Sequence, residues 1–189
     1  MANTLLLSIL IPTLEKRRRE FYDLVDYLHR LVDLHALDDV VEIAFLSDDG
    51  QMPTGTKRRQ LYEMANGLYS WQIDDDDTIP SSALLAICNA ARAGQDCITF
   101  EERCLIDNKE YRSNFSLKYE DWADNQDGFD YVRTPFFKTP ILTELCLKAE
   151  IPPITWGEDH AFARAVKPLL KSEIHIPHQL YHYIKNNQR

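Results

Sequence analysis

The stretch Leu68-Tyr-Ser-Trp-Gln-Ile-Asp-Asp-Asp-Asp77 joins an apolar segment to four consecutive carboxylates. Leu68–Ile73 follows Gly67, a residue typical of helix ends, and is predicted to be a buried strand that runs directly into the aspartates. Like charges a few ångströms apart raise one another's pKa, so four neighbouring carboxylates are costly to ionise together. We therefore expect a cation beside Asp74–Asp77, at the carboxyl end of this strand.

Strands and helices alternate around this stretch. Leu5–Ile11 is a continuous apolar run ended by Pro12, as is typical of a buried parallel strand. From about Arg18 to Leu37, apolar residues recur at three- and four-residue spacing, which predicts a helix packed on a sheet. The predicted strands span 5–11, 40–46, 68–73 and 97–100, and the predicted helices between them span 18–37, 56–66 and 80–92. This order predicts an α/β fold with one Rossmann-like, doubly wound, mostly parallel sheet, whose ligands collect at the carboxyl ends of its strands.

The second half of the chain has weaker patterns. Residues 102–134 are rich in Asn, Asp, Tyr and Trp and lack periodicity, so we expect irregular structure with at most a short hairpin. Such a loop-rich segment often carries substrate recognition. Apolar spacing predicts further helices over 137–149 and 158–170.

Composition narrows the class of protein. The net charge of −9 argues against broad attraction to nucleic acid or anionic lipid, although Lys16–Arg19 and Lys57–Arg59 could form local basic sites. Four scattered cysteines without a C-x-x-C pair argue against a zinc knuckle and a disulfide framework. No apolar stretch approaches the roughly 20 residues of a membrane span, so we expect no integral membrane segment and a cytoplasmic location.

The D-x-D spacing within Asp74–Asp77 suits a divalent cation. Magnesium and manganese are commonly held by one or two carboxylates together with substrate phosphate oxygens. A calcium EF-hand would need Gly and Glu where Ile79 and Leu85 stand, so that interpretation fails. The competing interpretation is a solvated acidic turn that caps the next helix. A second acidic pair, Asp48-Asp49, follows the preceding strand and favours a functional site.

In their order and spacing, the motifs of this chain resemble those of the family 2 glycosyltransferases, nucleotide-sugar-dependent enzymes of the GT-A fold. The motifs are Ser8–Thr13, Ser47–Gly50, Lys57–Arg59 with Ala65–Gly67, Ile73–Asp77, and Trp156–Asp159. Together they cover roughly residues 6–165. The resemblance implies a single GT-A domain over residues 1–189, with a nucleotide-binding half over about 1–100 and an acceptor and catalytic half over about 101–189.

The resemblance also implies a pocket for a nucleoside-diphosphate sugar, with a UDP-sugar as the first expectation. The residues implied to bind this donor are Pro12, Thr13, Asp48 or Asp49, Lys57 or Arg58, Asp74 and Asp75. Asp74 and Asp76 match the D-x-D motif and would hold Mn²⁺ or Mg²⁺, with Asp76 as the more direct ligand.

Glu158-Asp159 matches the late acidic pair of the family. The resemblance implies that Asp159, with Glu158 beside it, is catalytic: the Asp takes the acceptor hydroxyl proton while that oxygen displaces the nucleoside diphosphate with inversion. Taken alone, the pair also fits the acidic first turn of an ordinary helix. His175 and His178 are candidates to complete the metal shell, in a segment that also resembles the closing Tyr-x-Tyr strand of the family.

The acceptor and two alternative functions stay open at this level. As a hexosyltransferase or related transferase, the protein is expected to act on a saccharide or lipid-linked acceptor, with a modified DNA base less favoured. Leu14–Arg17 departs from the Asn or Glu-Arg usual in the family, so the nucleotide contacts of this loop are not implied. A nucleotidyltransferase would normally have a Gly-rich loop, which is missing after Ile11. An inactive sugar-nucleotide-binding module would not need Asp159.

Overall fold

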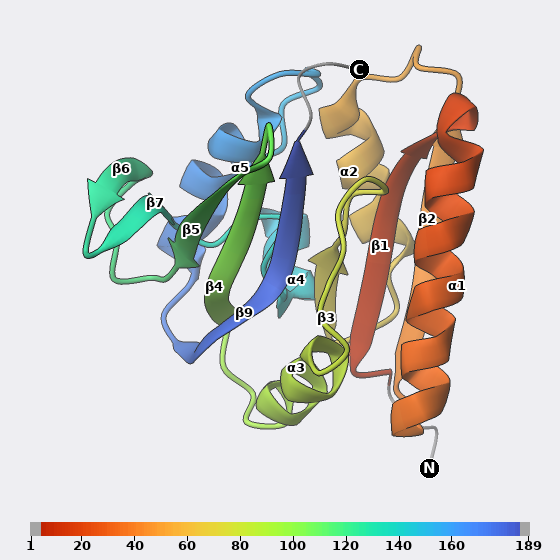
Figure 1. Ribbon diagram of the computed structural model, residues 1–189, viewed down its shortest axis with the longest axis horizontal. Coiled ribbons are helices and arrows are strands. Elements are labelled where there is room, and N and C mark those ends of the chain that lie inside the picture. Colours follow the sequence, from red (N-terminus) through yellow and green to blue (C-terminus); the bar gives the residue numbers. More distant parts are fainter. Residues whose placement is uncertain (1–4, 186–189) are drawn as a thin grey trace.

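The computed structural model describes residues 5–185 and contains a single mixed sheet flanked by helices (Figure 1). The strands are β1 (Leu7–Leu14), β2 (Val41–Asp48), β3 (Tyr69–Gln72), β4 (Cys97–Ile106), β5 (Lys109–Phe115), β6 (Ala123–Gln126), β7 (Phe129–Arg133), β8 (Ile141–Leu142) and β9 (Glu173–Lys185). The helices are α1 (Arg18–His35), α2 (Thr54–Met64), α3 (Ala83–Ala91), α4 (Thr143–Lys148) and α5 (Glu158–Val166), with short 3-10 turns at Glu15–Arg17 and Lys167–Leu169.

The centre of the sheet is parallel. β1 pairs in parallel with β2 and β3, and β4 pairs in parallel with β9. The short β8 is antiparallel to both β3 and β4, so β2, β1, β3, β9 and β4 run in one direction. Figure 1 shows β9 between β3 and β4, with β5, β7 and β6 extending the sheet beyond β4. This arrangement confirms the predicted mostly parallel α/β fold and brings the carboxyl ends of β1, β2, β3 and β9 to one edge.

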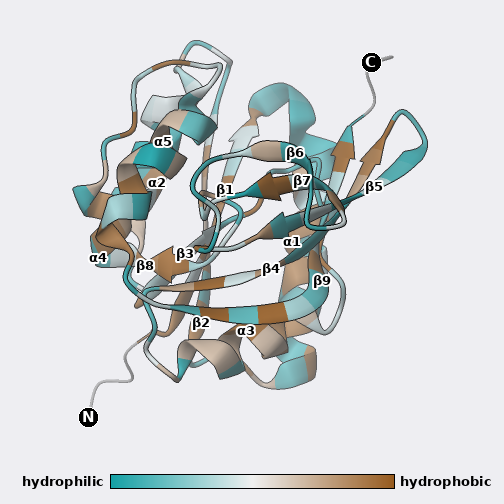
Figure 2. Cartoon of the chain, turned by 90° about the vertical axis from the view of Figure 1, so that its left-hand side faces the viewer, coloured by the Kyte–Doolittle hydropathy of each residue, from teal (hydrophilic) through white to brown (hydrophobic). Residues whose placement is uncertain are grey.

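Two layers of helices cover the sheet. Figures 1 and 2 show α1 and α3 on one face and α2, α4 and α5 on the other. The buried positions of α1, from Phe21 to Val32, follow the three- and four-residue spacing expected for a helix packed on a sheet. The helix ends at Ala36, whose φ of 51° is the left-handed conformation common after helix C-termini.

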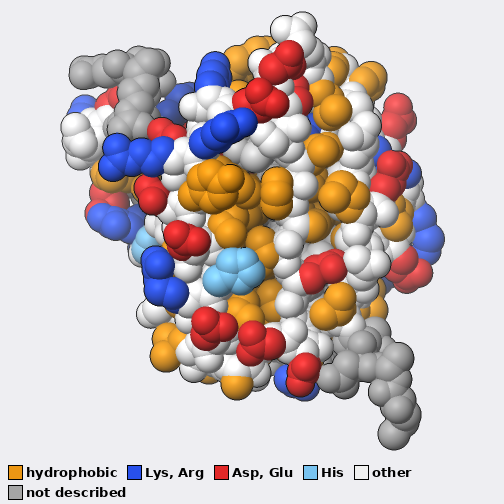
Figure 3. All heavy atoms as spheres, turned by 90° about the vertical axis from the view of Figure 1, so that its right-hand side faces the viewer, with side chains coloured by type: hydrophobic (Ala, Val, Ile, Leu, Met, Phe, Trp, Pro, Cys, Tyr) orange, Lys and Arg blue, Asp and Glu red, His pale blue; other side chains and the backbone are white. Residues whose placement is uncertain are grey.

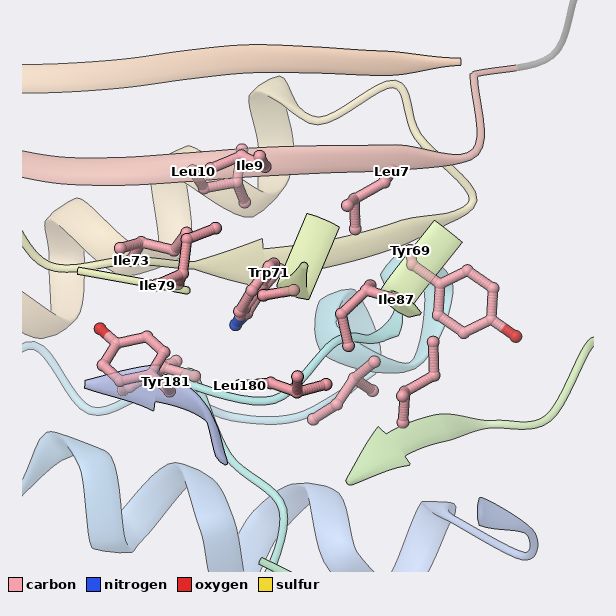
Figure 4. Packing of buried hydrophobic residues seen from close by; sticks show 14 of the residues in the cluster. Leu7, Ile9, Leu10, Tyr69, Trp71, Ile73, Ile79, Ile87, Leu180 and Tyr181 are labelled. Atoms are coloured by element: carbon pink, nitrogen blue, oxygen red, sulfur yellow. The ribbon is translucent and has the colours of Figure 1, made fainter. Parts of the chain in front are cut away.

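The core lies between the parallel strands and their helices. Figure 4 shows side chains of β1, β3, α3 and β9 packed against one another, with Trp71 of β3 in the middle. Trp71 is fully buried, its ring meets Phe100 edge-on at 6.0 Å, and its indole N–H donates to the Lys138 carbonyl at 2.7 Å. The predicted apolar strands therefore form the core.

A second apolar surface lies outside this core. Figure 3 shows hydrophobic side chains gathered on the side of the molecule where α1 and β2 lie. The exposed large hydrophobic residues of these two elements are Tyr22, Leu34 and Phe45. Within residues 5–185, no strand pairs with the outer edge of β2.

The structure differs from the sequence prediction most strongly over residues 102–134. This segment is not irregular: β4 continues to Ile106 and forms a hairpin with β5, and β6 and β7 form a second hairpin. Tight left-handed turns make these hairpins possible, because Asp107 and Asn108 have positive φ angles, as does Gly128.

The predicted helix over 137–149 is wrong in its first half, since only Thr143–Lys148 is helical. Pro140 cannot occupy a helix interior, and the carbonyls of Phe137 and Pro140 instead accept hydrogen bonds from Gln72 and Ile98 at the strands. The other predicted helices exist with ends that differ by a few residues, and the last ends at Val166, where a 3-10 turn containing Pro168 follows. No helix of residues 5–185 has the length and apolar character needed to cross a membrane.

Truncation of a β1 side chain should destabilise this fold. Leu10 is fully buried, so Leu10→Ala should lower the free energy of unfolding by about 2–5 kcal/mol, measured by urea denaturation. Leu34→Ala removes the same atoms from a side chain of α1 that is 68% exposed, and should change the free energy of unfolding by less than about 0.5 kcal/mol. Equal losses in both variants would contradict the placement of β1 in the core.

Candidate active site

The four aspartates after β3 are each held by side chains from distant parts of the chain. Asp74 Oδ1 pairs with Arg58 Nη2 at 2.9 Å. Asp75 is buried, and its two oxygens accept hydrogen bonds of 2.6 Å from Thr13 Oγ1 and Arg17 Nη1. The first two carboxylates are therefore fixed in the wall of the site.

Asp76 is the most exposed of the four aspartates. Arg17 Nη1 reaches its Oδ2 at 3.0 Å, and 48% of the side chain is exposed. Burial raises the pKa of Asp76, and the charges of Asp74 and Asp75 raise it further, against the opposing charge of Arg17. A cation approaching from solvent would meet this carboxylate first.

The side chain of Asp77 is fully buried and anchors the loop. It accepts from Tyr181 Oη at 2.8 Å and from the Ile184 amide at 2.9 Å, and lies 3.3 Å from Lys138 Nζ. Burial raises the pKa of Asp77 to about 7, although Lys138 acts in the opposite direction. Tyr181 Oη also accepts the Asp74 amide at 3.2 Å, so β9 holds both ends of the acidic loop.

Arg58 joins the two acidic motifs. Besides Asp74, it contacts Glu158 through its Nε at 3.4 Å, and its guanidinium lies 4.5 Å from the centre of the Phe137 ring. Burial opposes its charge, but Asp74 and Glu158 keep the pKa of Arg58 above its ordinary value. Glu158 is itself buried, which raises its pKa. Arg58 and Glu158 therefore form a buried ion pair that connects the start of α5 to the acidic loop.

Lys57, in the first turn of α2, also holds a carboxylate of the site, that of Asp48 at the end of β2. Its buried ammonium pairs with Asp48 and donates to the Thr13 carbonyl at 2.6 Å. The other Asp48 oxygen accepts the amides of Gly50 and Met52 at 2.9 and 2.8 Å. Burial alone would raise the pKa of Asp48, but these partners lower it. Asp48 thus shapes the loop that follows β2.

An open cavity of about 520 Å³ lies over these groups. The predicted site residues among its lining are Pro12, Thr13, Lys57, Arg58, Asp74, Asp75, Asp76, Glu158 and Asp159. The structure therefore brings together predicted site residues from four motifs that are far apart in the sequence, and Gly50 of the fifth motif also lines the cavity. Asp48 and Asp49 do not line this cavity, and the exposed Asp49 caps the Gln51 amide at 3.1 Å.

Asp159 lies in the first turn of α5, after Gly157, whose φ of 82° turns the chain into the helix. One of its oxygens, Oδ1, accepts the His160 amide at 2.8 Å. The side chain lines the 520 Å³ cavity and also a neighbouring cavity of about 290 Å³. Asp159 thus lies at the boundary between the two cavities.

The structure does not bring His175 or His178 to the aspartates. His175 pairs with Thr99 near the start of β9, and its Nδ1 lies 3.0 Å from Thr99 Oγ1. The contacts between β9 and the acidic loop come from Tyr181 to Ile184, at the other end of the strand. Within residues 5–185, no cluster of three or more His, Cys, Asp or Glu side chains is arranged to hold a metal ion.

Sequence reasoning missed three contributors: Arg17, Lys138 and Tyr181. Arg17 belongs to the basic run after β1, but nothing in the pattern singled it out from its neighbours. Lys138 fell in a segment predicted to be helical, although it lies between the buried carboxylates of Asp77 and Glu102. The four adjacent aspartates were the one signal that could have pointed to Arg17 and Lys138, because their charges require cations from elsewhere in the chain.

No protein-family model matches this sequence, and no curated protein matches it. The structure is similar to that of S. aureus TarS 1–349 (TM-score 0.66, 13% identity, 95% of this chain) and to its complex with UDP-GlcNAc (TM-score 0.68, 12% identity, 98% of this chain). This chain spans 60% of those chains, and 37% of the chain in another TarS structure (TM-score 0.63, 12% identity, 95% of this chain). The protein therefore has the GT-A fold of glycosyltransferase domains.

Removal of the Arg58 charge should destabilise the protein, because two carboxylates of the site lose their cation. Arg58→Met leaves Asp74 and Glu158 without their shared partner and should lower the free energy of unfolding by about 3–5 kcal/mol. Arg19→Met, in α1, removes a guanidinium that is 93% exposed and lies 3.9 Å from Asp23, and should cost about 1 kcal/mol or less. Urea denaturation of both variants measures the difference, and similar losses would contradict the buried bridging role of Arg58.

Proposed function

We propose that this protein is an inverting glycosyltransferase that moves a sugar from a nucleoside-diphosphate sugar to an acceptor hydroxyl. The observation that carries the proposal is the convergence of Asp74–Asp76, buried Lys57 and Arg58, and Asp159 on one cavity of about 520 Å³ at the carboxyl ends of parallel strands. A donor with two phosphates needs compensating charge, and an attacking hydroxyl needs a base. Asp159 offers the base, and a divalent cation held by Asp74 and Asp76 would supply the compensating charge.

UDP is the first expectation for the donor nucleotide. Two TarS structures of the same fold are complexes with UDP-GlcNAc and with UDP, which supports a uridine nucleotide as the first ligand to test. Pro12 and Thr13 at the end of β1 lie on the proposed base and ribose side, and the Thr13 carbonyl is fixed there by Lys57. Asp48 supports this wall through Lys57 without lining the cavity.

The chemistry of the aspartates fits Mn²⁺ or Mg²⁺. Asp76 offers one accessible carboxylate, with Asp74 two residues before it in the same cavity, and such ions are commonly held by one or two carboxylates plus substrate phosphates. Burial raises the pKa of Asp76, and the charges of Asp74 and Asp75 add to this effect, so a cation bound at this carboxylate would favour its charged form. When bound, the ion would offset the charge that develops on the leaving diphosphate.

Asp159 is the proposed general base. As the acceptor oxygen bonds to the anomeric carbon, the bond from that carbon to the diphosphate oxygen breaks and the hydroxyl proton passes to the Asp159 carboxylate. Attack from the face opposite the leaving group inverts the configuration. Glu158, held by Arg58, fixes the start of α5 and so positions its neighbour. A saccharide or lipid-linked acceptor is favoured over a modified DNA base, because the net charge of −9 does not suit DNA.

Two substitutions separate donor binding from turnover. Asp159→Asn should keep nucleotide binding and lower the rate of UDP release from a UDP-sugar by about 10²- to 10⁴-fold, since only the base is lost. Asp76→Ala should abolish the manganese-dependent part of nucleotide binding. Asp38→Ala, on the exposed turn between α1 and β2 at the opposite end of the sheet, is the control and should change neither quantity. Isothermal titration calorimetry and a UDP-release assay measure the two effects.

Chelation gives an independent check on the donor site. UDP, GDP, CDP and dTDP are titrated with manganese and again after addition of a chelator. We expect one nucleotide to bind about tenfold or more weakly after chelation, because the ion links its phosphates to Asp76. Binding of no nucleotide under either condition would overturn the donor site, and binding without turnover in the unaltered protein would support an inactive binding module instead.

A further inference from the structure

The neighbouring cavity of about 290 Å³ is built on one face of the sheet. Its floor comes from alternate residues of adjacent strands, which point to the same side: Glu102, Cys104 and Ile106 of β4, Ser113 and Phe115 of β5, and Tyr131 and Arg133 of β7. This is the segment that lacked a pattern in the sequence. Trp122, Phe136 and Phe137 close the cavity with aromatic side chains.

Two buried polar atoms in this cavity lack a partner. Among residues 5–185, neither Ser113 Oγ nor Trp122 Nε1 has a hydrogen-bond partner, and Ser113 is only 1% exposed. Buried polar groups are almost always paired, because leaving one unpaired costs about 1–3 kcal/mol. An indole N–H and a serine hydroxyl between aromatic walls suit a ligand with hydroxyl groups on an apolar ring.

The charges lining the cavity are already paired. Lys138 Nζ lies 2.9 Å from Glu102 Oε1, and it also contacts Asp77. Arg133 contacts Asp124, and its guanidinium lies 5.1 Å from the centre of the Trp122 ring. A phosphate or carboxylate on the ligand would therefore find no uncompensated cation there. The cavity favours an uncharged ligand.

The place of the 290 Å³ cavity beside the donor cavity indicates what it binds. It shares Arg58, Asp74, Asp159 and Tyr183 with the donor cavity, so the two spaces meet at the proposed base. The acceptor must reach this base from the side opposite the donor. We infer that the cavity is the acceptor subsite and binds one uncharged sugar unit, with Ser113 Oγ and Trp122 Nε1 hydrogen-bonded to its hydroxyls. This inference rests on the proposed glycosyltransferase function.

The Trp122 indole N–H gives a direct reporter. The chain has three tryptophans, so ¹⁵N-labelled protein should show three indole resonances, and Trp122→Phe identifies one of them. Methyl glycosides of glucose, galactose and N-acetylglucosamine are titrated with and without UDP and manganese. At least one glycoside should shift the Trp122 resonance, while glycerol 3-phosphate should not shift it.

Ser113→Ala keeps the reporter and should weaken binding of the same glycoside about threefold to tenfold, the effect of one hydrogen bond. Ser81→Ala, on the exposed surface before α3, is the matched control and should leave the affinity unchanged. UDP binding should be equal in both variants.

Three results would overturn the acceptor assignment: no glycoside shifts Trp122, glycerol 3-phosphate shifts it, or a UDP-sugar shifts it where UDP alone does not. The last result would assign the cavity to the sugar of the donor. Failure of UDP to bind counts separately against the donor site, because the glycoside titrations without UDP still decide what the smaller cavity binds.

Discussion

Compensation of the charges of Asp74–Asp77 is the constraint on which this structure depends. Four carboxylates in sequence repel one another, and all four contact a guanidinium or ammonium group, because the 3-10 turn after β1, helix α2 and the segment before β8 supply Arg17, Arg58 and Lys138. Asp75 shares Arg17 with Asp76. The packing of the surrounding elements therefore also brings the cations that neutralise the acidic loop.

This compensation separates buried carboxylates that anchor the loop from carboxylates that face the cavity. Asp77 is enclosed by Tyr181, Lys138 and the backbone of β9, so it fixes the loop without facing solvent. Asp76 is half exposed and faces the cavity. The same division holds at α5, where Glu158 is buried against Arg58 and Asp159 lines both cavities. In each acidic motif one residue is held by the surrounding structure and its neighbour faces the cavity.

The sequence predicted the parallel core well because buried strands such as Leu5–Ile11 leave a continuous apolar pattern that local physics explains. It failed over 102–134 because the strands there have polar residues on the face that lines a cavity, as at Glu102 and Ser113, so the expected alternation of apolar and polar residues is lost. It could not place His175, whose position relative to the aspartates depends on the register of β9 against β4. Register of a parallel pair so distant in sequence has no local signal.

The insertion of β9 between β3 and β4 has a consequence for how the molecule is made (Figure 1). Tyr181 lies 104 residues after Asp77, and Ile184 lies 107 residues after it, yet both hold that carboxylate. On the ribosome, β1, β2 and β3 emerge long before these contacts can form. The acidic loop therefore acquires its final geometry only after synthesis of β9, so a nascent chain that stops short of this strand has the motif but not the site.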